Sequence, residues 1–355
     1  MVRSRLFTST TLIILAGLVL GIFAALLVRW DNPPNMGICV ACFMRDTVGA
    51  LGLHKAGTLQ YIRPEIIGLV LGSFVAAYVF GEFRARGGSS PLVRFLLGAL
   101  VMVGALVFLG CPIRATLRLA GGDLNGITGL GGVAVGALAG ILFLKRGYNL
   151  GRATKMPTAQ GWIVPLVAIV LLLFVIVTPW FILSSIKGPG SMHAAIGISV
   201  GIGLLVGVLA QRTRMCFVGA WRDLFLLRDG YLMSAVVATL LGALVLNLAL
   251  GQFDLGFKGQ PISHTSHLWN FLGMALVGLG ATFLGGCPLR QLILSGEGDS
   301  DAAMTVLGLF TGAAFVHNFG LASSAAGPSD AGKWAVMLGL AITICFGVLM
   351  RARKS

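Results

Sequence analysis

The chain has 355 residues, of which 57% are hydrophobic and 11% are charged, and its formal net charge at pH 7 is +14. Soluble domains carry about 25% charged residues, so this composition excludes an ordinary soluble protein. The excess of Lys and Arg would suit nucleic-acid binding, but its position in loops between apolar segments indicates membrane orientation instead.

Ten apolar segments, nearly free of charge, are candidates for transmembrane helices. A helix needs about 20 apolar residues to cross a bilayer, and most of the segments approach this length. They comprise residues 10–28, 66–80, 95–111, 124–144, 162–183, 193–209, 232–250, 268–286, 302–319 and 334–350. The predicted fold class is therefore an all-α polytopic membrane protein. We expect the first segment to be retained, because no small-residue cleavage site follows it.

Loop cations predict which side of the membrane each loop occupies. Threading the ten spans alternately places the N-terminus (residues 1–9), the 81–94 and 145–161 loops, the 210–214 turn and the C-terminus on one side. Most loop cations lie there, including Arg3, Arg5, Arg353 and Lys354, whereas the other side has chiefly Arg63, Lys187, Lys258 and Lys333. By the positive-inside rule, both termini are predicted to be cytoplasmic.

The sequence contains an internal repeat. The stretch "CVACFMRD" at 39–46 matches "CFVGAWRD" at 216–223, and "FLGCPIRATLRLAGGD" at 108–123 matches "LGGCPLRQLILSGEGD" at 284–299. The matches divide the chain into two repeats and three other parts. Repeat one covers 10–145 and repeat two covers 193–320, joined by a basic loop and a linking helix at 146–192 and followed by a last helix and basic C-terminus at 321–355.

The span count predicts that the second repeat is inverted. Each repeat holds four spans, an even number, and the single linking span then makes the second repeat enter from the opposite side. Inverted repeats are typical of transporters, which bind substrate near the midplane at the repeat interface.

The matched motifs are too short to cross a membrane. The segments 36–53, 111–120 and 287–296 are apolar but brief, and the last two begin with Cys-Pro, which suits the first turn of a helix. Irregular backbone at membrane depth is tolerated only inside protein or beside a wet cavity. We therefore expect four half-membrane segments that meet near the centre.

Four cysteines recur at matched positions and are predicted to line a substrate pathway: Cys39, Cys111, Cys216 and Cys287. A thiol is a weak hydrogen-bond donor and a polarisable contact, which suits a solute that carries sulfur or selenium. Cys42 completes a C-x-x-C motif with Cys39 but has Gly219 as its counterpart in the second repeat, so it is a secondary candidate. Cys345, in the last span, is expected to be a buried structural thiol.

Arginines in the motifs must form ion pairs, lie near an interface or contact water, because inserting an Arg at the centre of a membrane helix costs about 2.5–3.5 kcal/mol of free energy. Arg114 and Arg290 have no adjacent carboxylate and are predicted to attract an anion along the pathway. Two adjacent Arg-Asp pairs are secondary candidates, either as structural ion pairs or as the mouths of the path: Arg45 with Asp46, and Arg222 with Asp223.

These motifs resemble the YeeE/YedE sulfur-transport family. The strings "GICVACFMRD", "FLGCPIRATLRLAGGDLN" and "FLGGCPLRQLILSGEGD" are similar to its selenium-associated YedE branch. The resemblance implies an inner-membrane protein with an hourglass shape, in which two vestibules meet at a thin barrier. It also implies that thiols pass the substrate by S–H hydrogen bonds, and the matching residues are Cys39, Cys111, Cys216 and Cys287.

The predicted function is uptake of a small selenium- or sulfur-containing anion, with a cytoplasmic sulfur or selenium carrier protein as a suggested partner. No catalytic residue, cofactor or metal is predicted. Three alternatives stay open: transport of thiosulfate or another sulfur anion rather than selenium, a membrane thiol-disulfide oxidoreductase that uses Cys39 and Cys42, and a scaffold without transport.

Overall fold

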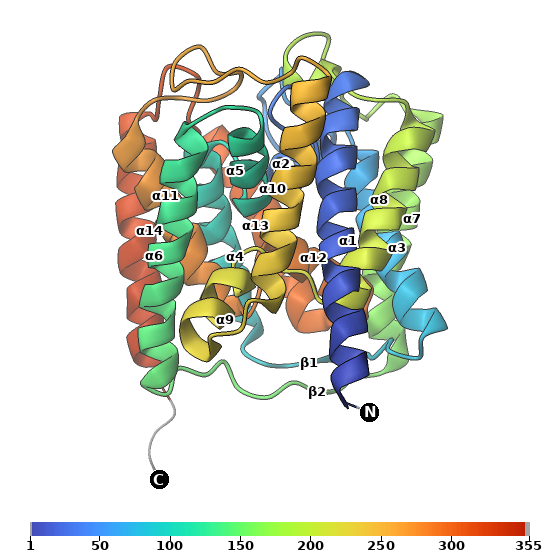
Figure 1. Cartoon of the computed structure of the whole chain (residues 1–355), viewed down its shortest axis with the longest axis vertical. Coiled ribbons are helices and arrows are strands. Elements are labelled where there is room, and N and C mark those ends of the chain that lie inside the picture. The colour runs from blue at the N-terminus through green and yellow to red at the C-terminus, as the bar shows by residue number, and fades with distance from the viewer. Residues whose placement is uncertain (1, 352–355) are drawn as a thin grey trace.

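The computed structural model describes the backbone of residues 2–351 and the side chains from residue 9 onward. Figure 1 shows a bundle of long helices with shorter helices between them. The side chains of Arg3 and Arg5, and all of Arg353 and Lys354, lie outside the described residues, so their predicted placement stays a prediction.

Every predicted span coincides with a long helix. These helices are α1 (Val2–Arg29), α3 (Pro64–Val79), α4 (Pro91–Phe108), α6 (Asn125–Lys145), α7 (Thr158–Val177), α8 (Ile196–Thr213), α10 (Tyr231–Ala249), α11 (His267–Leu284), α13 (Ser300–Asn318) and α14 (Asp330–Leu349). Within residues 2–351, eight segments are long and apolar enough to cross a membrane, and α3 and α13 are not among them. The all-α prediction is confirmed, and the span count is supported for eight of ten.

The linking helix ends earlier than predicted. The span predicted at 162–183 corresponds to α7, which ends at Val177. Thr178 adopts a left-handed conformation with φ +46, and Pro179 follows it. A left-handed residue followed by proline ends a helix, since proline cannot continue it, so the apolar residues after Thr178 lie in a loop.

Short helices occupy the motif segments. They are α2 (Val40–Ala50), α5 (Pro112–Ala120), α9 (Gly219–Leu227) and α12 (Pro288–Gly296), and a 3₁₀ turn lies at Pro189–Ser191. Proline opens α5 and α12, as the sequence predicts. Helix α2 packs against α12, so a motif helix from each half of the chain meets the other.

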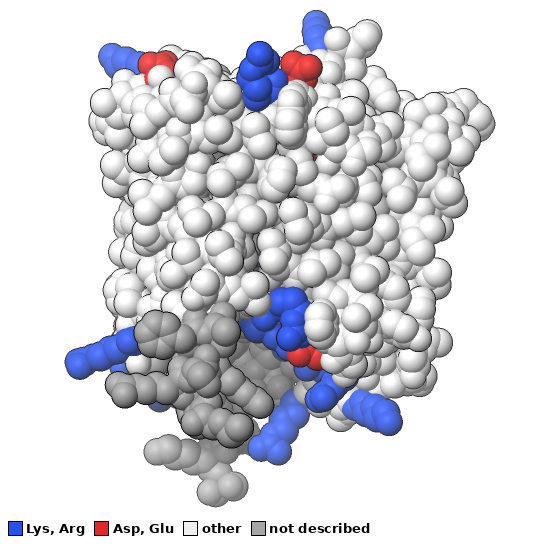
Figure 2. All heavy atoms as spheres, turned by 45° about the vertical axis from the view of Figure 1, so that its right-hand side comes forward, with Lys and Arg blue, Asp and Glu red and all other residues white. Residues whose placement is uncertain are grey.

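The loops predicted to share one side meet at one end of the molecule. Strand β1 (Arg86–Gly87) pairs with β2 (Thr154–Lys155), and Glu82 forms ion pairs with Arg212 and Arg214. Helix α1 begins and α14 ends at this same end (Figure 1). Lys and Arg side chains also gather there on the face that Figure 2 shows.

Four helix pairs form most of the bundle, namely α1 with α10, α3 with α8, α4 with α13, and α6 with α11. The sequence repeat matches α1 to α8, α3 to α10, α4 to α11 and α6 to α13. Under this matching, α1–α10 corresponds to α8–α3, and α4–α13 corresponds to α11–α6. The four pairs are therefore two kinds of contact, each made twice.

Glycine lets these helices approach closely. A Cβ atom added at Gly136 of α6 would collide with the carbonyl oxygen of Ala275 on α11, whereas one added at Gly131 of the same helix would lie 3.9 Å from the Phe271 ring. Small residues at such crossings bring helix backbones together in membranes.

We expect Gly136→Ala to lower the free energy of unfolding by about 1–3 kcal/mol, since overpacking forces backbone shifts. Gly131→Ala serves as the matched control and should be neutral or stabilising by up to about 1 kcal/mol, because alanine has a higher helix propensity than glycine. Thermal unfolding of the purified protein in detergent measures both. Equal melting temperatures for the two variants would contradict the α6–α11 contact.

Candidate functional site

The first thiol pair joins two motif helices at their N-termini. Cys39 is the N-cap of α2, where its Sγ accepts a hydrogen bond from the Cys42 N–H at 3.4 Å, and Cys111 is the N-cap of α5. The Sγ atoms of Cys39 and Cys111 lie 3.8 Å apart, and both residues are buried. The structure thus brings together two cysteines that the repeat matching singled out.

The second half of the chain builds a similar pair. The Sγ of Cys216 accepts hydrogen bonds from the N–H of Gly219 at 3.1 Å and from the N–H of Cys287, the N-cap of α12, at 3.3 Å. Both cysteines are buried. Among the described residues, no hydrogen bond links this pair to Cys39 or Cys111, so the structure forms two thiol pairs rather than one group of four.

Cys42 belongs to a different set of contacts. Its Sγ lies 3.8 Å from the Leu109 carbonyl oxygen, to which it donates, and 3.3 Å from Nη1 of Arg114. The thiol that has no counterpart in the second repeat therefore joins the first thiol pair to Arg114. All six cysteines are free thiols.

Arg114 is fully buried and is held by backbone carbonyl groups. Its guanidinium donates to Asn35 at 3.0 Å, to Ile262 at 3.0 Å, and to Leu109. Among the described residues, none of the ion pairs within 4 Å involves this guanidinium. The cluster of Cys39, Cys42 and Cys111 with Arg114 therefore carries a positive charge.

All three carbonyls come from residues in the left-handed region. The φ angles are +59 at Asn35, +66 at Leu109 and +49 at Ile262. Asparagine adopts this conformation readily, but a leucine or a β-branched isoleucine does so at a cost of about 1–2 kcal/mol each. Strained backbone persists where the surrounding structure enforces it, and these three conformations turn their carbonyl oxygens toward one guanidinium.

Arg290 differs from Arg114 in that it has a carboxylate partner, although none is adjacent to it in sequence. Its Nη1 lies 3.0 Å from Glu297, which also pairs with Arg214 at 3.1 Å. Glu297 follows Arg290 by two helical turns, so both side chains lie on one face of α12 although they are not adjacent in sequence. The matched position in the first repeat is Gly121, which explains why Arg114 has no such partner.

The ion pair at Glu297 extends to the end of the molecule where α1 begins and α14 ends (Figure 1). Glu82 accepts a hydrogen bond from Gln211 at 2.7 Å and pairs with Arg214 at 2.8 Å and Arg212 at 3.1 Å. The hydrogen bond from Gln211, followed by the two guanidinium groups, lowers the pKa of Glu82 below its ordinary value. Through Arg214, which pairs with both carboxylates, this group of ion pairs links Glu82 to Glu297.

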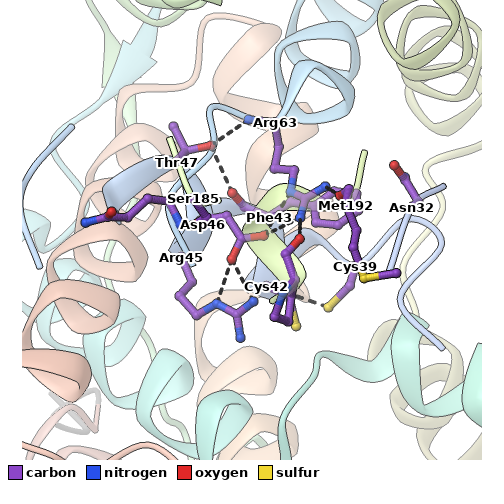
Figure 3. A network of polar contacts seen from close by, with 12 residues as sticks. Asn32, Cys39, Cys42, Phe43, Arg45, Asp46, Thr47, Arg63, Ser185 and Met192 are labelled. Atoms are coloured by element: carbon purple, nitrogen blue, oxygen red, sulfur yellow. Dashed lines mark hydrogen bonds and ion pairs between the residues drawn. The ribbon is translucent and has the colours of Figure 1, made fainter. Parts of the chain in front are cut away.

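The two Arg-Asp motifs also have unequal surroundings. Asp46 is fully buried between Arg45 at 2.6 Å and Arg63 at 2.8 Å (Figure 3). Arg63, predicted to be a loop cation, is instead buried and donates to the carbonyls of Met192 and Pro189. By contrast, Arg222 and Asp223 form a single pair at 2.8 Å that is partly exposed.

Cys345 is exposed on α14 rather than buried as predicted. The buried residues of this helix recur every three or four positions and form one face: Gly332, Val336, Gly339, Thr343 and Gly347. Cys345 lies off that face. In the part of the chain from residue 2 to 351, no group of three or more His, Cys, Asp or Glu side chains is placed to hold a metal ion.

Comparisons with known proteins give a family and two relatives. A family model described as sulphur transport matches residues 1–113 and 212–352. The thiosulfate transporter TsuA of Spirochaeta thermophila is 34% identical over 107 residues, which is 30% of this chain and 32% of that protein. An uncharacterized protein of Methanocaldococcus jannaschii is 28% identical over 93 residues, which is 23% of this chain and 89% of that protein. The match to TsuA thus spans about a third of its length.

Removing the buried carboxylate should destabilise the protein strongly. Asp46→Asn leaves Arg45 and Arg63 buried without a counter-charge, and breaking such a pair costs about 3–5 kcal/mol. Asp223→Asn, the matched variant in the second repeat, should cost about 1 kcal/mol or less, since its pair is partly exposed. Thermal unfolding in detergent compares the two. If Asp223→Asn is the more damaging, the structural role assigned to Asp46 is wrong.

Mild oxidation should cross-link Cys39 to Cys111. Their Sγ atoms need a small approach to reach the S–S bond length of about 2.05 Å, and a copper-phenanthroline oxidant supplies the electron acceptor. Peptide mass spectrometry should find the Cys39–Cys111 link in the wild type, and Cys111→Ala should lose it. A link between Cys39 and Cys42 as the main product would favour the oxidoreductase alternative instead.

Proposed function

The chain belongs to the sulphur transport family, and from this premise we propose that it takes up a small sulfur- or selenium-containing anion. The anion passes a constriction lined by the two thiol pairs, Cys39 with Cys111 and Cys216 with Cys287. The proposed process is transport without a chemical step, so none of these residues is assigned a catalytic role.

One observation carries the proposal: buried thiols lie beside a buried guanidinium that has no carboxylate partner among the described residues. Arg114 contacts the Cys42 sulfur at 3.3 Å, and Cys39 and Cys111 lie 3.8 Å apart. The positive charge attracts an anion, while sulfur offers a polarisable contact and a weak S–H donor. An anion with a terminal sulfur or selenium matches both features.

The paired packing of the two halves supports an inverted-repeat, hourglass arrangement. Each kind of helix contact occurs twice under the sequence matching. Transporters of this architecture bind substrate at the interface between repeats. Cys39, Cys111 and Cys287 directly precede α2, α5 and α12, and Cys216 lies three residues before the start of α9. In this proposal one thiol pair faces each vestibule.

The loop cations support a cytoplasmic position of both termini in the inner membrane. The end of the molecule where α1 begins carries β1, β2 and the 210–214 turn, and Lys and Arg gather there (Figure 2). Under the positive-inside rule this end is cytoplasmic. The Cys39–Cys111 pair, on the opposite half, then meets the incoming anion first.

Thiosulfate is the first substrate to test, with selenite as the competing one. TsuA is named a thiosulfate transporter, and its match covers about a third of each chain. Sulfate has the same charge as thiosulfate but lacks its terminal sulfur, so it isolates the contribution of the thiols. Proteoliposome uptake of the three labelled anions, with and without a pH gradient, separates the candidates.

Replacing Cys111 or Cys287 by alanine should slow uptake of the preferred anion at least about tenfold, equivalent to roughly 1.4 kcal/mol in the barrier. Cys345→Ala is the matched control, because that thiol lies on the outer surface of α14, and it should transport normally. Normal uptake by both Cys111→Ala and Cys287→Ala, at wild-type protein amounts, would disprove the thiol pathway.

A further inference from the structure

A cavity of about 210 Å³ lies directly beside the Arg114 cluster. Its walls include Leu106 and Leu109 at the end of α4, Ile262 in the loop before α11, and the segment after α13. Leu109 and Ile262 are two of the residues whose carbonyls hold Arg114. The cavity is therefore separated from the thiols by the same backbone that binds the guanidinium.

Two polar side chains that line this cavity have unused hydrogen-bonding atoms. Nε2 of His317 and Oγ of Ser323 find no hydrogen-bond partner among the described residues, and Ser323 is only 8% exposed. Buried polar atoms in native structures are nearly always paired with protein or water. Two of them at one cavity indicate that a polar ligand or water completes the site.

Arg45 also lines the cavity and has donor capacity left. Nε and Nη2 of Arg45 donate to Asp46, whereas Nη1 donates to no described residue. In Figure 3 both dashed lines from the Arg45 guanidinium lead to Asp46. A guanidinium has five N–H donors and no acceptor, so the free side of Arg45 suits an anion.

The charge around the cavity is positive. Asp46 is shared by Arg45 and Arg63, so that this trio has one excess positive charge, and Arg114 adds a second. No Asp or Glu is among the residues that line the cavity. The volume is below the roughly 300–1,000 Å³ of sites for drug-sized ligands, which limits the occupant to a small ion with its water.

Leu109 has a feature that its repeat counterpart lacks. The matched position is Gly285, which adopts φ +78 without steric cost, whereas Leu109 adopts φ +66 with a large side chain. Leu109 is 5% exposed and lines the cavity, and its carbonyl binds both Arg114 and Cys42. The leucine thus lies between the cavity and the thiol cluster.

We propose that the cavity between Arg45, His317 and Ser323 is a capture site for a small oxyanion, and that Leu109 separates it from the thiols. The anion's oxygens accept from Nη1 of Arg45, from Oγ of Ser323 and from the His317 ring. This inference rests on the proposed function and adds a binding step before the thiols. It predicts that capture depends on negative charge and oxygen acceptors, and that selection for sulfur or selenium comes afterwards.

Binding of thiosulfate and of sulfate to the purified full chain in detergent tests the site, measured by calorimetry and by thermal stabilisation. Both anions should bind to the wild type. Ser323→Ala should weaken sulfate binding about tenfold, and His317→Ala should weaken it similarly. Ser323→Ala removes no internal hydrogen bond, because its Oγ has no described partner, so the variant should fold normally.

Two further variants make the outcomes separable. Ser234→Ala, on α10, is the serine control and should bind sulfate like the wild type. Cys111→Ala should bind sulfate normally and yet take up the preferred anion at least about tenfold more slowly. Sulfate binding by Ser323→Ala and His317→Ala at wild-type affinity, or no sulfate binding by the wild type, would overturn the capture site. Weakened binding in these variants without any uptake by wild-type proteoliposomes would uphold the site and reject the transport proposal.

Discussion

The first half of the site depends on the hydrogen bonds that the buried guanidinium of Arg114 donates to backbone carbonyls. Helices that stop inside a membrane protein leave carbonyl groups without partners, and these must be satisfied by protein. Arg114 binds the carbonyl of Leu109, at the end of α4, and those of Asn35 and Ile262, which lie in two loops. One side chain therefore fixes the segment before α2, the break between α4 and α5, and the loop before α11, and it places its charge beside the thiols.

Much of this arrangement was predictable from sequence, because composition and repetition are global signals. The lengths of the apolar segments predicted the ten long helices. The internal repeat singled out Cys39 and Cys111 as members of one group of matched cysteines. Three features were not predictable. Glu297 reaches Arg290 across two helical turns, and Arg63 is buried by a loop distant in sequence. Ile262 adopts a left-handed backbone conformation, which β-branched residues avoid. Its conformation therefore depends on tertiary contacts, which the local sequence does not reveal.

The two halves share motifs but differ in charge. In the first half Asp46 is shared by two arginines and Arg114 has no carboxylate partner among the described residues. In the second half Asp223 pairs with Arg222, and Glu297 pairs with Arg290 and Arg214. The matched cysteines therefore lie in a positive environment on one side and in a more nearly neutral one on the other. The two pairs of matched thiols therefore differ in the charge that surrounds them.

This asymmetry fits the requirements of a path that conducts an anion in the proposed direction. Conduction needs binding that is favourable enough for entry and weak enough for release. The unpaired charges of the first half favour entry, whereas Glu297 already occupies Arg290 and competes with an arriving anion. Because Gly121 stands where Glu297 would lie in the first repeat, this difference between matched positions leaves Arg114, but not Arg290, without a carboxylate partner among the described residues.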